Sequence, residues 1–103
     1  MEKKIKEIAK LKENWDGYGA RPIYPEVIEN TRTFLNTIGE RNDLEKDDIT
    51  PTPYGSICIE FPKVSVEIGI HKIGWFALFD IDNISEGEDT DFLSIPEKLK
   101  ELL

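Results

Sequence analysis

The loop formed by residues 14–22 carries the side chains of this sequence that are best suited to bind a ligand. Its two aromatic rings can stack on a planar group, its guanidinium can make a two-pronged contact with phosphate or carboxylate, and its carboxylate can accept a hydrogen bond from a ribose or a base. Backbone N–H groups beside its two glycines can reach an anion. The candidate ligand- or partner-binding residues are Trp15, Asp16, Tyr18 and Arg21 of this loop, together with Trp75 of a later strand.

The same loop also has a purely structural explanation, which the sequence leaves open. Trp15 can plug the core, and Asp16 can accept hydrogen bonds from backbone N–H groups two residues on, as aspartate does in turns. Arg21 can then pair with that carboxylate. A turn between two helices has no evident need of Tyr18 or Arg21, so these two residues carry most of the functional interest.

Catalytic and metal-binding constellations are not indicated elsewhere in the sequence. The single histidine, His71, is predicted on a two-residue turn, without the nucleophile and the orienting partner that a catalytic histidine needs. The single cysteine, Cys58, lies within a strand and has no basic neighbour that would activate it. One cysteine with one histidine cannot build a usual zinc site. We therefore predict a protein that is not an enzyme and that holds no cofactor and no metal.

The acidic segment 80–91 matches a calcium-binding loop only in part. Its six carboxylate residues surround Gly87, but a loop that starts at Asp82 has Leu93 where the twelfth position requires glutamate. We predict a solvated loop for this segment.

The charge of the chain restricts the class of partner. A formal net charge of −8 and a pI near 4.6 argue against direct contact with nucleic-acid backbones, whose phosphates are neutralised by lysine and arginine. The same charge favours a basic partner. No apolar run approaches the ~20 residues of a membrane helix, and the N-terminus lacks the apolar block of a signal peptide. We therefore expect no membrane association and a cytoplasmic location.

Two helices are predicted to flank the loop. Residues 2–14 show an imperfect apolar stripe, and the glycines after Trp15 are expected to end this first helix. The second helix is predicted over 25–38, because Pro25 suits a first helical position, Gly39 suits a C-cap, and apolar residues recur at helical spacing between them.

Strands are predicted from residue 49 onward, where the period of the apolar residues changes to two. The clearest are 57–61, 64–70 and 73–81, and their short connections imply antiparallel pairing. The strand 73–81 is apolar on both faces. It is therefore either central and covered on both sides, or in contact with a partner, for which a second copy of the chain is one option.

The whole chain, residues 1–103, is predicted as a single α+β domain. Two N-terminal helices are expected to pack on a three- to four-stranded antiparallel meander, and Pro96 is expected to begin a short C-terminal helix.

The block from Leu11 to Ile23, followed by a helix that contains Val27 and Ile28, resembles a family of small, mostly uncharacterised bacterial and phage proteins. The shared signature is a leucine followed by Trp-Asp-Gly-x-Gly-Ala-x-Pro-Ile. A later Pro-Thr-Pro-x-Gly-Gly segment of the family is similar to residues 51–56, with Ser56 in place of the second glycine. The resemblance implies a bacterial, often phage-associated setting and no transferable activity.

Two binding functions are consistent with the sequence. The first is a non-enzymatic binding protein, such as a phage accessory or counter-defence protein that sequesters a nucleotide-like small molecule, with the loop as its site in a homo-oligomer. The second is an acidic protein-interaction module, antitoxin-like or a mimic of nucleic acid, that binds a basic protein partner. An enzyme has the least support, because no catalytic constellation is indicated.

Overall fold

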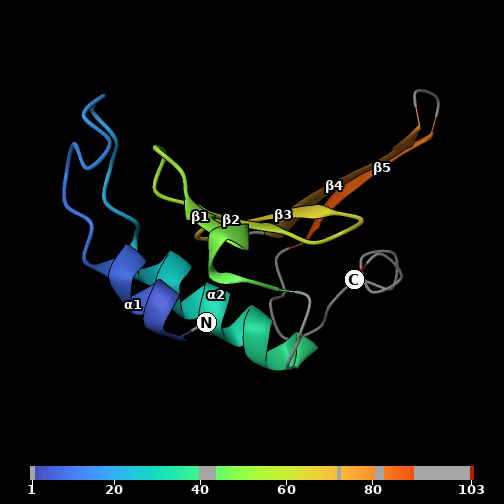
Figure 1. Ribbon diagram of the computed structural model, residues 1–103, viewed down its shortest axis with the longest axis horizontal. Coiled ribbons are helices and arrows are strands. Elements are labelled where there is room, and N and C mark those ends of the chain that lie inside the picture. Colours follow the sequence, from blue (N-terminus) through green and yellow to red (C-terminus); the bar gives the residue numbers. More distant parts are fainter. Residues whose placement is uncertain (1, 40–43, 72, 81–82, 90–102) are drawn as a thin grey trace.

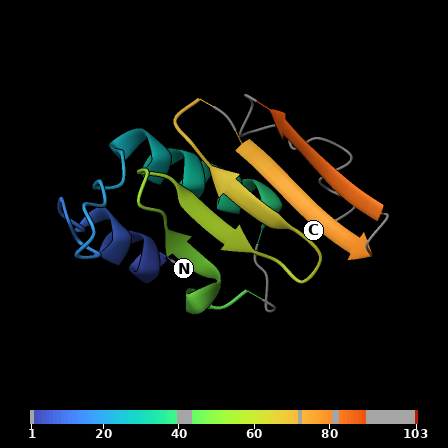
Figure 2. The ribbon, with the colours of Figure 1, turned by 90° about the horizontal axis from the view of Figure 1, so that it is seen from above.

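Alternating apolar residues build most of a five-stranded antiparallel sheet, and two helices pack on one face of its first three strands, β1 to β3 (Figure 1). The computed structural model describes residues 2–39, 44–71, 73–80, 83–89 and 103, and for 75–80 and 83–89 it describes the backbone alone. The elements are α1 (Glu2–Ala9), α2 (Pro25–Ile38), a 3₁₀ turn η1 (Lys46–Asp48), β1 (Ile49–Pro51), β2 (Ile57–Glu60), β3 (Ser65–Ile68), β4 (Ile73–Asp80) and β5 (Asn83–Asp89). Figure 2 shows the strands side by side in chain order.

The register of β1, β2 and β3 separates an apolar face from a polar one. Ile49 pairs with Ile59, and Ile59 with Val66, and all three side chains are 0% exposed. The neighbouring row on the opposite face begins with Thr50 and Cys58. This alternation follows from the period of two along a strand. The core therefore lies between the sheet and the helices.

Helix α2 confirms the predicted second helix at both ends. Pro25 occupies the first turn, and the N–H of Gly39 donates to the carbonyl oxygen of Leu35 at 3.1 Å. Its buried stripe packs on β2 and β3. Phe34 meets Phe61 of the β2–β3 connection edge to face, with ring centroids 6.3 Å apart. Packing of this stripe fixes α2 along the sheet.

Helix α1 is shorter than predicted, since it ends at Ala9 and not at residue 14. The N–H groups of Lys10 and Leu11 still donate to carbonyls three residues earlier, which tightens the last turn. Asn14 then adopts a φ of +63°, and its N–H donates to the carbonyl oxygen of Ala20 at 2.7 Å. A loop hydrogen bond thus replaces the helical one at Asn14.

The sheet has more strands than the three to four that were predicted. One addition, β1, has only three residues and is too short to show an alternating pattern. The other, β5, occupies most of the acidic segment 80–91, so the prediction of a solvated loop there is wrong for residues 83–89. Backbone pairing with β4 holds this polar strand in place without an apolar pattern of its own.

Strand β4 confirms the predicted strand over residues 73–80, and residue 81 lies outside the described residues. The strand lies inside the sheet, paired with β3 on one side and β5 on the other. The strand is therefore central, as one of the two explanations for its sequence expected, whereas the described helices pack on β1, β2 and β3. The predicted C-terminal helix from Pro96 lies outside the described residues. None of the described helices has the length and the apolar character needed to cross a bilayer.

Candidate functional site

The functional candidates gather where two loops rise side by side at one end of the sheet (Figure 1). The first loop, residues 14–24, leads into α2, and the second, residues 52–56, joins β1 to β2. The N–H of Arg21 donates to the carbonyl oxygen of Pro53 at 3.0 Å, and the N–H of Tyr24 donates to that of Gly55 at 3.3 Å. We call this pair of loops the two-loop tip.

Polar side chains of the first loop are used to fold it. Asp16 accepts hydrogen bonds through Oδ1 from the N–H of Tyr18 at 2.8 Å and from that of Ala20 at 3.1 Å. Asn14 accepts through its own Oδ1 from the N–H of Gly19 at 2.7 Å. The structural role expected for Asp16 is therefore present, and the carboxylate serves the loop's own backbone.

Trp15 and Arg21 hold the loop in ways that differ from the structural alternative. The indole N–H of Trp15 donates to the carbonyl oxygen of Arg21 at 2.7 Å, and its half-buried ring lies outside the buried core. The expectation that Trp15 plugs the core is therefore wrong, and its indole joins the two ends of the loop. Nη1 of Arg21 donates to the hydroxyl of Tyr24 at 2.8 Å, so the expected pairing with Asp16 is wrong as well.

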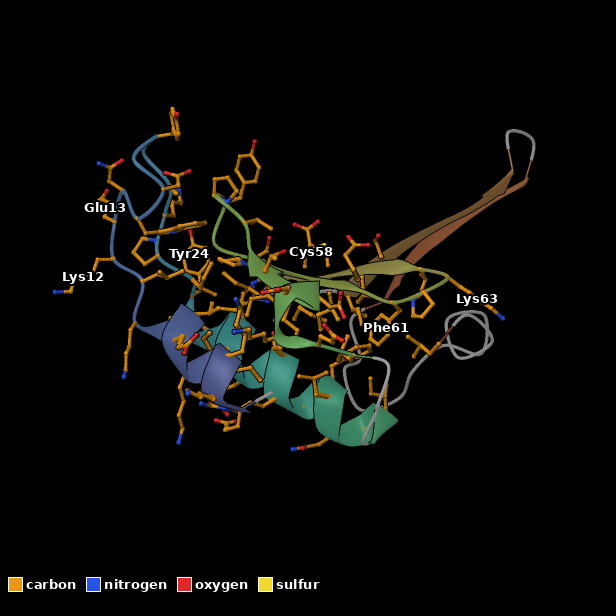
Figure 3. The ribbon with its side chains drawn as sticks, in the orientation of Figure 1. Lys12, Glu13, Tyr24, Cys58, Phe61 and Lys63 are labelled. Atoms are coloured by element: carbon orange, nitrogen blue, oxygen red, sulfur yellow. The ribbon has the colours of Figure 1, made fainter. Side chains whose placement is uncertain are left out.

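Tyr24 and Gly55 join the two loops through close packing. Figure 3 shows Tyr24 at the base of the tip, between the first loop and the β1–β2 connection. Gly55 has a φ of +91°, and a Cβ built on it would lie 2.6 Å from the Tyr24 ring. No larger residue fits there without displacing the ring, so Gly55 lets the second loop approach the first.

Side-chain hydroxyls hold the second loop. The hydroxyls of Thr52 and Ser56 share a hydrogen bond of 2.6 Å, and the N–H groups of Tyr54 and Ser56 reach the Thr52 hydroxyl at 3.3 Å. Ser56 also donates to Oε2 of Glu67 in β3 at 2.6 Å. The loop is thereby fastened to the sheet.

Two tyrosines stand out from this scaffold. Tyr18 is 93% exposed and Tyr54 is 80% exposed, and they are the exposed large hydrophobic side chains of the part of the chain whose side chains are described. Each lies on a different loop of the tip. Tyr54, Tyr24 and Gly55 were not singled out from the sequence, although the Pro-Thr-Pro-Tyr-Gly segment was a turn signal.

The structure does not bring Trp75 to the other predicted site residues. Its backbone lies in β4 opposite Val66 of β3, whereas the two-loop tip adjoins the start of β2. Strand β4 is two strands away from β2, or about 10 Å across the sheet. Of the five predicted site residues, Trp15, Asp16, Tyr18 and Arg21 therefore lie together in the first loop, and Trp75 lies apart from them.

The surroundings of Cys58 on the polar face of the sheet raise the pKa of its thiol. Figure 3 shows Cys58 on the side of the sheet away from the helices. Burial, then the charge of Glu60 and a hydrogen bond to it, then the charge of Glu67, raise the pKa of the Cys58 thiol to about 11. The thiol is therefore protonated at neutral pH. Within the residues whose side chains are described, no three histidine, cysteine, aspartate or glutamate side chains gather closely enough to hold a metal ion.

Replacing Asp16 with alanine is expected to lower the free energy of unfolding by about 2 kcal/mol, because two backbone N–H groups lose their acceptor. Asp16→Asn keeps the Oδ1 acceptor and is expected to cost about 0.5 kcal/mol. Urea denaturation of both variants measures the difference. Equal stability of Asp16→Ala and the wild type would show that the carboxylate is not needed by the loop.

Comparison of the chain with protein-family models, with curated proteins and with solved structures finds no match. The resemblance to the bacterial and phage family stays a prediction. Function is inferred below from the geometry of the two-loop tip and from the distribution of charge.

Proposed function

We propose that the protein is a non-enzymatic binding protein that contacts a partner protein through the two-loop tip. The observation that carries the proposal is the exposure of Tyr18 and Tyr54 on two loops that are hydrogen-bonded to each other. Tyrosine supplies a large, rigid contact area at a low cost in conformational entropy, and it is enriched among the residues that dominate binding energy.

The tip is also organised before any partner arrives. Asp16, Asn14 and Trp15 fix the first loop, and Thr52 and Ser56 fix the second. A surface that is already ordered loses little entropy on association, and more of its contact energy appears as affinity.

A protein partner fits this geometry better than a small molecule. Sites for small ligands are concave and present a few convergent polar groups. In the two-loop tip, the Oδ1 of Asp16 and the indole N–H of Trp15 are engaged within the loop, and Tyr18 protrudes from it. The net charge of −8 supports a basic partner, because complementary charge speeds association and adds specificity.

A nucleotide-like small molecule is the second candidate. The ring of Tyr18 is exposed for stacking, and the exposed Arg21 uses Nη1 toward Tyr24 while a guanidinium carries five N–H donors. Sequestration of such a signal would suit the phage accessory or counter-defence setting that the sequence resemblance implies.

The test compares Tyr18→Ala/Tyr54→Ala with Asn36→Ala/Thr37→Ala, a control of equal charge on the exposed surface of α2. A protein captured from bacterial lysate by the wild type is purified, and its affinity for each variant is measured by calorimetry. The tyrosine variant is expected to bind at least 30-fold more weakly, at roughly 1 kcal/mol or more for each ring, and the control is expected to bind normally.

The same preparations are titrated with cyclic nucleotides and ADP-ribose-type nucleotides, for which no binding heat is expected. Unchanged affinity of the tyrosine variant for the captured protein would contradict the proposal. A nucleotide signal that disappears in Tyr18→Ala and Arg21→Ala would favour the second candidate.

A further inference from the structure

One face of the sheet is not covered by the described helices. Helices α1 and α2 both pack on the apolar face (Figure 1), and Cys58 marks the opposite face in Figure 3. We call this opposite side the open face. Half of every strand's positions belong to it, because successive residues of a strand alternate between faces.

The charged residues of the five strands are all acidic. None of the residues in the five strands is lysine or arginine, although the chain contains 13 of them. The acidic residues of the strands are Glu60, Glu67, Asp80, Glu86, Glu88 and Asp89.

The register places four of these acidic positions in two adjacent rows of the open face. One row runs Thr50–Cys58–Glu67–Gly74–Glu88 across all five strands. The next runs Glu60–Ser65–Phe76–Glu86. The acidic positions therefore extend from β2 to β5 on one face.

The two described carboxylates of the open face are held in place by hydrogen bonds and are in no ion pair with another described side chain. Glu60 accepts from the Ser65 hydroxyl and Glu67 from the Ser56 hydroxyl, each at 2.6 Å. Among the described side chains, the ion pairs join Arg32 to Glu2 and Glu29. All three residues belong to the helices, which lie on the other side of the sheet (Figure 1). Two exposed, hydrogen-bonded carboxylates thus lie on the open face, and neither is ion-paired with a lysine or arginine whose side chain is described.

We propose that the open face docks a lysine- or arginine-rich segment of a partner protein. A second copy of this chain is a poor occupant, because a two-fold interface would place carboxylate against carboxylate. A nucleic acid would add its own negative charge. The longer row spans five strands, or about 19 Å, which a basic segment of six extended residues can cover.

The open face is separate from the two-loop tip, so an experiment can contradict one of the two proposals without contradicting the other. The probe is a capped octapeptide of alternating lysine and serine, which presents all its lysines on one side when extended. Titration into ¹⁵N-labelled protein at low salt is expected to shift the amide signals of Cys58, Glu60, Ser65 and Glu67. Shifts confined to the two-loop tip or to the helices would overturn the open-face proposal and leave the tip untouched.

Two variants of equal net charge give the decisive comparison. Glu60→Gln/Glu67→Gln removes the open-face charges while keeping acceptors for both hydroxyls, and Glu7→Gln/Glu26→Gln removes two exposed charges from the helices. The first pair is expected to weaken peptide binding about tenfold and the second less than twofold. If both pairs weaken peptide binding equally, the effect comes from net charge alone and the proposal is overturned. A concentration-dependent dimer that Glu60→Gln/Glu67→Gln abolishes would also overturn it, because the occupant would then be a second copy of the chain.

Discussion

Replacing Gly55 with alanine is expected to lower the free energy of unfolding by about 3 kcal/mol and the Tm by about 15 °C. Its φ of +91° strains any residue with a Cβ, at about 1 kcal/mol or more. The added carbon would also lie 2.6 and 2.7 Å from two ring carbons of Tyr24 and 3.3 Å from the carbonyl oxygen of Pro22. The ring cannot swing away without breaking the hydrogen bond from Arg21.

Gly17 provides the matched control, since it has a φ of +78° and open space around its Cα. Gly17→Ala is expected to show the backbone cost alone, at about 1 kcal/mol. In a Tyr24→Ala background the effect of Gly55→Ala should fall to the same value, because the obstructing ring is gone. Chemical denaturation of the wild type, Gly55→Ala, Tyr24→Ala and their double variant completes the cycle, and Gly17→Ala is measured beside them. Equal effects of Gly55→Ala and Gly17→Ala in the wild-type background would contradict close packing between the loops.

Alkylation of Cys58 by iodoacetamide at pH 8 is expected to be roughly two orders of magnitude slower than alkylation of cysteine in the denatured chain. The reactive species is the thiolate, and the pKa of Cys58 is raised to about 11 by burial and by Glu60 and Glu67. Rates measured from pH 7 to pH 11 should still be rising where the denatured chain has levelled off. A folded-state profile that levels off near pH 9 would contradict the raised pKa.

The same pKa shift predicts how Cys58 contributes to stability. Because the folded-state pKa is raised from 9.0 to about 11, the contribution is fully present below about pH 9 and is lost as the pH rises toward 11. Glu60→Gln removes one source of the shift, so it should lower the pKa of the thiol and speed its alkylation. Any loss of folding in this variant is detected by its amide spectrum.

The parts of the fold that were predicted correctly have strong periodic patterns. Helix α2 has a proline, an apolar stripe and a glycine in the expected places, and β2 and β3 alternate clearly. The end of α1 was missed because the apolar stripe continues past Ala9, whereas the helix tightens at Lys10 and Leu11 and the N–H of Asn14 bonds forward to Ala20 within the loop. Strand β5 was missed because its polar, acidic sequence has no alternating apolar residues, and it is held by backbone pairing with β4.

The sequence predicted one of the two loops that form the candidate site. The sequence indicated the first loop and the turn-forming role of Asp16, which local rules describe. It did not indicate Tyr54 or Gly55, because their importance comes from contact between their loop and the first loop, which lies about 30 residues earlier along the chain. Arg21 was assigned the wrong partner, since Tyr24 becomes available only when α2 begins at the next residue.

The two outermost described strands make the sheet a poor template for aggregation. Unpaired strand edges recruit strands from other molecules, and proteins avoid this with short strands, proline and charge. Strand β1 has three residues and ends in Pro51, which has no N–H to donate, and β5 carries Glu86, Glu88 and Asp89 within seven residues. Growth of the sheet by strand addition, the first step toward an amyloid-like fibre, is therefore opposed at both edges.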